Sequence, residues 1–160
     1  MEWTRDGYTI STDPDHLDRR VVHEFLVGSY WAKGIPREVV DRSIENSMPF
    51  GVYEGDDLVG FARVITDKAT FAYLSDVFIV DAHRGRGLSK WLMEIILAHP
   101  DLQNLRRWSL TTRDAHGLYG QFGFTALAKP ERHMEMLDAD VYERGSPKPK
   151  AQSPNGPGQA

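Results

Sequence analysis

The first fifty positions carry apolar residues at helical spacing. Every third or fourth residue is apolar in two segments, 12–28 and 36–47, which predicts two amphipathic helices. Thr12-Asp13-Pro14 supplies a capping side chain and a proline at the start of the first segment, and Pro36 opens the second. The inward-facing positions are Leu17, Val21, Val22, Phe25, Leu26, Val39, Val40 and Ile44.

From Phe50 the pattern changes to short runs of β-branched and aromatic residues separated by turns. Runs 50–54 and 58–65 flank the turn Gly55-Asp56-Asp57, which predicts a β-hairpin, and a further strand is predicted over 71–80. An earlier short strand is predicted at 8–11. The middle of the chain therefore reads as three consecutive antiparallel strands.

The rest of the chain alternates again between strand and helix. A helix over 86–98 is predicted before Pro100, and a strand over 107–111 that pairs parallel with run 71–80. A short helix follows over 115–122. Segments 125–128 and 133–137 are predicted to form a closing antiparallel pair. The expected fold is one α/β domain (α+β) over residues 1–144, with a mixed sheet between helices.

Composition limits the classes of function. The chain has 160 residues, 41% of them apolar, and a formal charge of −4, which gives no general reason to bind nucleic acid. Cysteine is absent, so thiolate catalysis and disulfides are excluded. The charged N-terminus and the lack of a long apolar run predict a cytoplasmic protein without a membrane partner. Residues 145–160 lack an apolar pattern and are predicted to be disordered.

A basic corner with two glycines joins run 71–80 to the helix that follows. It reads Arg84-Gly85-Arg86-Gly87-Leu88-Ser89-Lys90. The first N–H groups of a helix have no intrahelical acceptor and attract anions, glycine permits close approach of the backbone, and arginine adds charge. The sequence alternatively allows a surface turn with solvated arginines. Its position between strand and helix favours a phosphate site.

The order of elements together with this corner resembles the GCN5-related N-acetyltransferases (GNAT family). The family motif Arg/Gln-x-x-Gly-x-Gly/Ala is matched from Arg84 to Ser89, with serine in the last position. The resemblance implies that the backbone amides of residues 85–90 hold the pyrophosphate of acetyl-CoA. It also implies that the fourth and fifth strands splay apart, so that the backbone of Val77, Phe78 and Ile79 binds the pantetheine arm. These three residues can pack the core at the same time.

A second segment, Ala115 to Phe124, is similar to the family pattern Ala-x-x-Leu-Tyr-x-x-x-Gly-Phe. The resemblance implies that Tyr119 protonates the departing thiolate, and the alternative is a half-buried structural aromatic. The family's frequent asparagine is replaced by Thr112, so a cofactor contact there is not expected.

Asp76 is a carboxylate inside an otherwise apolar strand, where burial favours a raised pKa and a role as general base or in substrate binding. Some relatives place a proposed base one residue earlier, where this chain has Ser75. Regular alternation would put that position on the opposite face of the strand. A structural, hydrogen-bonded Asp76 and a water chain as the base are equally open.

The acceptor is expected to bind beside the first two helices. Tyr30 and Trp31 would form an aromatic wall suited to an amine with a hydrophobic body or a cation, although packing is the commoner role of such residues. The histidine spacing predicts no metal site. We therefore expect acetyl transfer from acetyl-CoA to a small primary amine by direct attack, in a chain compatible with a homodimer. A peptide acceptor or a non-catalytic acyl-CoA-binding module are the alternatives.

Overall fold

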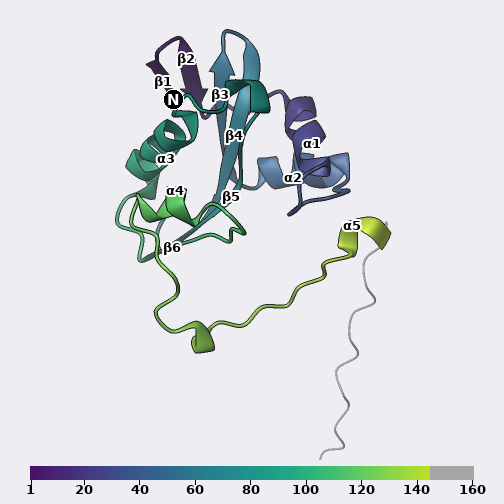
Figure 1. The fold of residues 1–160 in the computed structure, drawn as a ribbon, viewed down its shortest axis with the longest axis vertical. Helices are drawn as coiled ribbons and strands as arrows, with labels where there is room; N and C mark the ends of the chain where they lie inside the picture. The colour runs from purple at the N-terminus through teal and green to yellow at the C-terminus, as the bar shows by residue number, and fades with distance from the viewer. Residues whose placement is uncertain (145–160) are drawn as a thin grey trace, which may run out of the picture.

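A six-stranded sheet in the order β1 to β6 forms the centre of the molecule (Figure 1). The computed structural model describes residues 1–144, and the predicted disordered tail lies outside the described residues. Every neighbouring pair is antiparallel except β5 and β6, which are parallel as predicted. The strands are β1 Glu2–Arg5, β2 Tyr8–Ser11, β3 Met48–Glu54, β4 Asp57–Thr66, β5 Phe71–Ile79 and β6 Arg107–Ser109.

Strand β1 was not predicted, because Trp3 is its only large apolar residue. It pairs with β2 across Asp6 and Gly7, both with positive φ (52° and 83°). An Asp-Gly pair between two strands is a strong signal for a tight hairpin turn. That signal was present in the sequence, and β1 could have been found from it.

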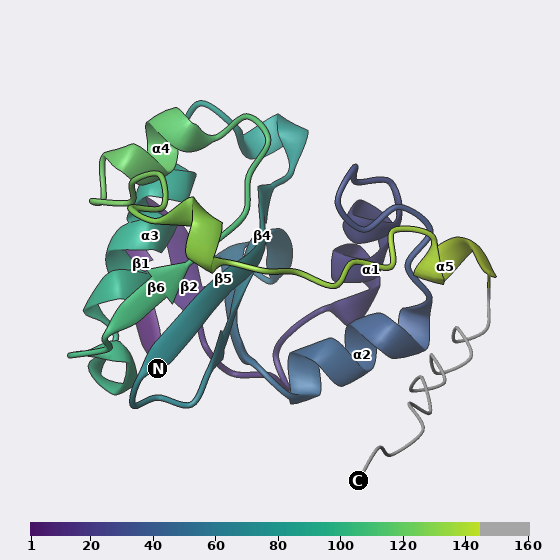
Figure 2. The same cartoon turned by 90° about the horizontal axis from the view of Figure 1, so that it is seen from below.

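Helices cover both faces of the sheet, with α1 and α2 on one side and α3 and α4 on the other (Figure 2). Their bounds are α1 Arg19–Val27, α2 Arg37–Glu45, α3 Leu88–Ala98, α4 His116–Gly120 and α5 Val141–Arg144. Helix α1 begins later than predicted because Asp18, rather than Thr12 or Asp13, caps it and accepts hydrogen bonds from the N–H groups of Arg20 and Val21. No helix in the described part of the chain is both long and apolar enough to cross a membrane.

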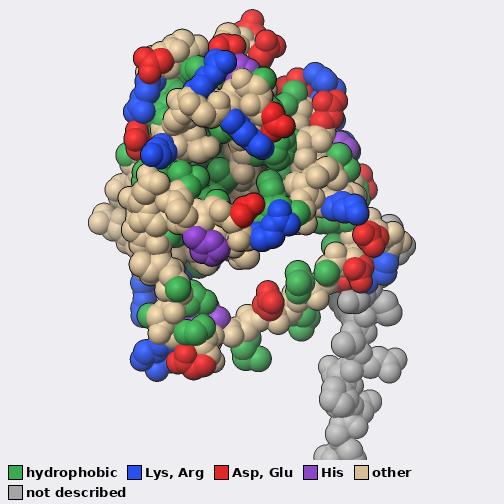
Figure 3. Space-filling view, in the orientation of Figure 1, with side chains coloured by type: hydrophobic (Ala, Val, Ile, Leu, Met, Phe, Trp, Pro, Cys, Tyr) green, Lys and Arg blue, Asp and Glu red, His purple; other side chains and the backbone are tan. Residues whose placement is uncertain are grey.

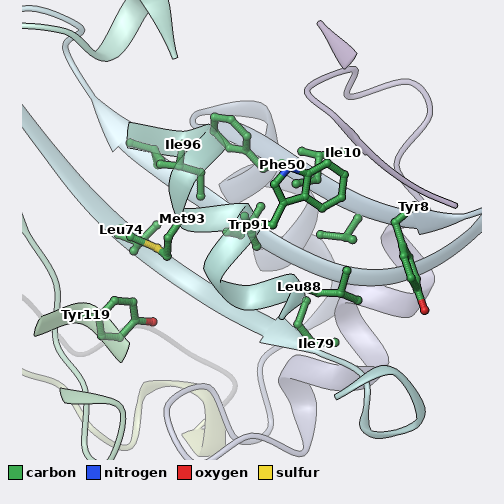
Figure 4. Packing of buried hydrophobic residues seen from close by; sticks show 14 of the residues in the cluster. Tyr8, Ile10, Phe50, Leu74, Ile79, Leu88, Trp91, Met93, Ile96 and Tyr119 are labelled. Carbon is green, nitrogen blue, oxygen red and sulfur yellow. The ribbon is translucent and has the colours of Figure 1, made fainter. Parts of the chain in front are cut away.

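Two hydrophobic clusters hold these layers together, one on each face of the sheet. Helix α3 packs on the first face, and Figure 4 shows Leu88, Trp91, Met93 and Ile96 between this helix and the strands. Helices α1 and α2 pack on the second face against Phe61 of β4 and other apolar side chains. Strands β4 and β5 contribute to both clusters, so their alternating side chains join the two halves of the core.

The parallel pair β5–β6 is short and opens along its length. It contains only the pairs Phe71–Arg107, Ala72–Trp108 and Tyr73–Ser109. Beyond Tyr73, β5 continues to Ile79 while the chain after Ser109 leaves the ladder. The expected splay of these two strands is therefore confirmed, and it opens the edge of β5 toward a cleft.

The predicted closing pair of strands was wrong. Residues 125–128 and 133–137 are not strands, because the 3-10 turn Pro130–Arg132 directs the chain away from the sheet. Residues 133–138, called the arm below, are extended and arch clear of the body (Figure 3). Met134 and Met136 are 99% and 101% exposed. Beyond the arm, Tyr142 of α5 packs against the cluster of α1 and α2.

Candidate active site

A cleft of about 1180 Å³ opens where β5 and β6 diverge. It is bounded by the corner before α3, by α4 and by the segment after α1. The structure brings almost all of the predicted site residues to this one space, and only Arg86 is missing from its lining. The predicted residues that line it are Tyr30, Trp31, Asp76, Val77, Phe78, Ile79, Arg84, Gly85, Gly87, Leu88, Ser89, Lys90 and Tyr119.

The corner presents its backbone to the cleft. Gly85 and Gly87 have φ of +74° and +76°, and an added Cβ would meet no atom within 4 Å at either position. Gly87 is the N-cap of α3, and within the described residues no side chain caps this helix. The N–H groups of Leu88, Ser89 and Lys90 therefore remain free to bind an anion at the positive end of the helix dipole.

The hydrogen bonds and ion pairs of the two arginines of the corner are made within the protein, although Arg84 also lines the cleft. The Nε atom of Arg84 donates to the carbonyl oxygen of Ile79 at 3.0 Å, and its guanidinium pairs with Asp81 at 2.9 Å. Arg86 turns toward the opposite side, where it donates to the hydroxyl of Tyr8 at 2.5 Å. Any anion site at this corner is thus built mainly from backbone N–H groups.

A β-bulge interrupts β5 at Asp76. The pairs Phe61–Phe78 and Arg63–Ser75 leave one residue of β4, Ala62, opposite two residues of β5, Asp76 and Val77. Asp76 has φ of +56°, in the left-handed region that aspartate tolerates better than most residues. The extra residue bends the strand at the cleft.

The bulge also cancels the regular alternation expected for this strand. The Oγ atom of Ser75 and the Oδ2 atom of Asp76 both accept hydrogen bonds from the Arg63 guanidinium. These two neighbours therefore share a face, and the expectation that they lie on opposite faces was wrong. Alternation resumes afterwards, because Phe78 joins one cluster and Ile79 the other.

Both carboxylate oxygens of Asp76 are engaged. The Nε atom of Arg63 donates to Oδ2 at 2.5 Å, and the indole Nε1 atom of Trp31 donates to Oδ1 at 2.9 Å. The side chains of Arg63 and Asp76 are only 16% and 7% exposed. This buried ion pair fixes Trp31 against β5. Arg63 was missed in the sequence, although a lone cation in the apolar run 58–65 could have indicated it.

Tyr119 lies in the wall of the cleft formed by α4, and its ring packs edge-on against Phe124. Burial raises the pKa of its phenol to about 12, with smaller contributions from Tyr30 and Asp114. The hydroxyl is therefore protonated throughout the neutral range. It is available as a hydrogen-bond donor inside the cleft.

Comparison with known proteins identifies the class of this cleft. Residues 45–126 match the sequence profile of the acetyltransferase (GNAT) domain. A Gibberella zeae protein described as a candidate acetyltransferase is 32% identical over 142 residues, covering 76% of this chain and 80% of that protein. The chain belongs to the GNAT family. It is an acyl-CoA-dependent acetyltransferase.

Solved structures of GNAT proteins share the fold. A candidate GNAT acetyltransferase from Xanthomonas campestris is 48% identical, with a TM-score of 0.84 over 87% of this chain and 99% of that one. A Clostridium acetobutylicum protein described as a predicted acetyltransferase with acetyl-CoA has the same fold at 12% identity, with a TM-score of 0.57 over 81% and 94% of the chains.

The part of the cleft that borders α1 is aromatic. Phe25 stacks on Phe78 at 3.8 Å between ring centroids, and Trp31 packs edge-on against Tyr30 at 5.1 Å. Arg113, which sequence reasoning missed, lies 3.8 Å from the centre of the Tyr30 ring. Tyr30 and Trp31 are 47% and 40% exposed, so they form a rim rather than a core. Among the described residues no group of three or more histidine or acidic side chains could hold a metal ion.

Proposed function

We propose that this GNAT acetyltransferase moves the acetyl group of acetyl-CoA to a small primary amine by direct attack in a ternary complex. The observation that carries the proposal is the continuity of the cleft. One space joins the uncapped start of α3, the unpaired edge of β5, Tyr119 and the aromatic rim.

The corner and β5 fit the donor. Backbone N–H groups of residues 85–90 would bind the pyrophosphate, with Lys90 adding charge and Arg84 holding the loop. The edge of β5 from Val77 to Ile79 would bind the pantetheine arm as an added strand would. The carbonyl of Ile79 already accepts from Arg84, so Val77 and Phe78 offer the freer backbone groups.

The reaction balances without a covalent enzyme intermediate. The neutral amine attacks the thioester carbonyl carbon, the C–N bond forms, and the C–S bond breaks. The proton lost by the amine neutralises the leaving thiolate, giving an amide and free CoA. The chain has no cysteine that could carry the acetyl group as a thioester, which is consistent with direct transfer from acetyl-CoA to the amine.

Tyr119 would act on the leaving sulfur. A free alkyl thiol such as that of cysteine has a pKa of about 8.5, far below that of Tyr119. Complete proton transfer from the phenol to the thiolate is therefore uphill. A hydrogen bond donated to the sulfur as negative charge develops is the more favourable contribution, since it is strongest in the transition state.

Asp76 would position the acceptor side rather than remove its proton directly. Its two oxygens already accept from Arg63 and Trp31, which leaves the amine to lose its proton to solvent or through a water chain. Glu135 and Leu137 of the arm also line the cleft, so an acceptor would have to fit beside them. This arrangement favours a small molecule over a protein chain.

A thiol-release assay tests the proposal, using acetyl-CoA with polyamines, arylalkylamines, aminoglycosides, amino acids and a set of peptides. We expect turnover with at least one small amine and little with peptides. Turnover confined to peptides would reassign the acceptor. Binding of CoA without acetylation of any amine would instead identify a non-catalytic acyl-CoA-binding module.

A further inference from the structure

His83 lies beside the corner and has no part in the donor site described so far. It ends the short 3-10 turn Asp81–His83, directly before Arg84, and it is half-buried. Its side chain lines the cleft together with Gly85 and Gly87 of the corner. An imidazole is therefore part of the same wall of the cleft as the backbone N–H groups that fit the pyrophosphate.

One ring nitrogen of His83 is engaged by the hydroxyl of Tyr8. The Nδ1 atom lies 3.1 Å from the hydroxyl oxygen, and the two rings meet edge-on. Tyr8 begins β2 and is only 6% exposed, and Figure 4 shows its hydroxyl at the end of the ring remote from the packed core. In the described part of the chain this hydroxyl has two partners, His83 and Arg86.

Arg86 determines which way the proton of the Tyr8 hydroxyl points. Its Nη1 atom donates to the phenol oxygen at 2.5 Å, and its guanidinium lies 3.8 Å from the carboxylate of Glu54. Because arginine only donates, the phenol proton is left for the lone pair on Nδ1 of the imidazole. A neutral ring that accepts at Nδ1 carries its own proton on Nε2. The edge of the His83 ring remote from Tyr8 therefore presents an N–H group.

This N–H group of His83 is suited to an anion. Among the described residues it has no hydrogen-bond acceptor. The series of hydrogen bonds that leads to it starts at a guanidinium, and each bond polarises the next, which makes the final N–H a stronger donor. A donor of this kind next to the free N–H groups at the start of α3 fits a ligand with several anionic oxygens.

We propose that His83 binds a phosphate oxygen of acetyl-CoA through its Nε2–H group, and that Tyr8 and Arg86 hold the imidazole in the tautomer that donates. Arg86 thus contributes to the donor site through two other side chains, although it does not line the cleft. The inference rests on the donor site proposed above, to which it adds one binding residue and two positioning residues. It is independent of the acceptor.

Binding of CoA to a pair of His83 variants tests the contact. His83→Leu and His83→Gln both lose the acceptor of the Tyr8 proton, but only glutamine keeps an N–H donor near the position of Nε2. We expect calorimetry to give a CoA dissociation constant roughly 10-fold higher for His83→Leu and within about 3-fold of wild type for His83→Gln. His116→Leu, at an exposed position outside the cleft lining, is the control. Wild-type affinity in His83→Leu, or an equal loss in His83→Gln, would overturn the proposal.

Truncated ligands test whether the contact is made to phosphate. Pantetheine has the arm of CoA without the phosphates, and its weaker binding can be followed by NMR titration. We expect His83→Leu to bind pantetheine as the wild type does, and an equal loss with both ligands would overturn the proposal. Dephospho-CoA lacks only the 3′-phosphate. A loss that persists with this ligand assigns the contact to the pyrophosphate, and a loss confined to CoA assigns it to the 3′-phosphate.

A double-variant cycle tests the positioning role of Tyr8. Tyr8→Phe removes only the hydroxyl and should weaken CoA binding by roughly 3-fold, with pantetheine binding unchanged. In a chain that already carries His83→Leu it should have no further effect, because the hydroxyl acts through the imidazole. Long-range ¹H–¹⁵N NMR should show the ring proton of wild-type His83 on Nε2, with a signal that shifts when CoA binds. Additive losses, or a ring proton on Nδ1 alone in the complex, would contradict this role.

Failure of this inference is distinguishable from failure of the donor site itself. Loss of CoA binding in Gly87→Glu, with unchanged binding in His83→Leu, would keep the donor site and remove only the contact of His83. A wild type that binds no CoA would overturn both.

Discussion

Asp76 combines two unusual properties at one position. Its backbone has the left-handed conformation of a bulge, and its side chain neutralises a guanidinium that is mostly shielded from water. Breaking a buried ion pair by removing one partner is costly, because the remaining charge is left without compensation. Stability and site geometry therefore depend on the same carboxylate.

Asp76→Asn separates charge from shape, because asparagine has the same size and tolerates positive φ. We expect the free energy of unfolding, measured by urea denaturation, to fall by about 3 kcal/mol. The double variant Arg63→Met, Asp76→Asn should recover part of this loss, because no buried charge remains. A single variant as stable as the wild type would contradict the assigned role of the ion pair.

Tyr119→Phe keeps the ring against Phe124 and removes only the hydroxyl. We expect kcat to fall by roughly 100-fold while KM for acetyl-CoA changes little, because the hydrogen bond to sulfur is made in the transition state. Since the pKa of Tyr119 is raised to about 12, this residue should cause no loss of wild-type activity up to about pH 10.

The control for that variant is Tyr73→Phe, which removes another hydroxyl from the cleft lining, one that donates to Thr111. It should keep most of the activity. Equal kcat values for Tyr119→Phe and the wild type would contradict the proposed role of Tyr119.

Among the elements, the link between β5 and α3 is the one that the sequence revealed best. The glycines, the strand before them and the helix after them are all local signals, so the corner could be predicted residue by residue. The direction of the Arg86 side chain could not, because its partners Tyr8 and Glu54 lie far from it in the sequence and are brought close only by the tertiary fold.

Gly87→Glu should abolish binding of CoA, but strain at φ +76° would contribute to any loss. Gly87→Gln carries the same strain without the charge and is the matched control. We expect Gly87→Glu to bind CoA roughly 100-fold more weakly than Gly87→Gln by calorimetry, with similar melting temperatures, because like charges meet at the pyrophosphate. Equal affinities would place the phosphates elsewhere.

The arm shows why other elements could not be predicted. Segments 125–128 and 133–137 have strand-like composition, yet a strand exists only where another backbone pairs with it. The turn at Pro130–Arg132 directs residues 133–137 away from residues 125–128, so the two segments do not pair with each other. The central hairpin β3–β4 was predictable because its partner is supplied a few residues away by the same stretch of sequence.

At the scale of the whole molecule, the cleft lies between α4 on one side and α1 and α2 on the other. These helices pack in different hydrophobic clusters. The α4 side belongs to one cluster and the α1–α2 side to the other, and β5 lies between them. A ligand that contacts the corner, β5 and α4 at once would therefore tie these parts together. Ligand binding and global stability should be coupled.

Acetyl-CoA at about 100 times its dissociation constant should stabilise the fold by about 2.7 kcal/mol. For a domain of this size the melting temperature should rise by roughly 5–10 °C, as measured by scanning calorimetry. Gly87→Glu should show no such rise. A wild type whose melting temperature is unaffected by acetyl-CoA would contradict the assigned donor site.

The bulge at Asp76 has a consequence for how such a site can originate. Before and after residue 76 the side chains of β5 alternate between the two faces of the sheet in the same order. Asp76 is therefore one extra residue in an otherwise regular strand. Deleting it would leave Ser75 and Val77 to Ile79 on their present faces and close the ladder with β4. A single inserted codon thus separates an ordinary sheet from one with a bulge in the wall of its cleft.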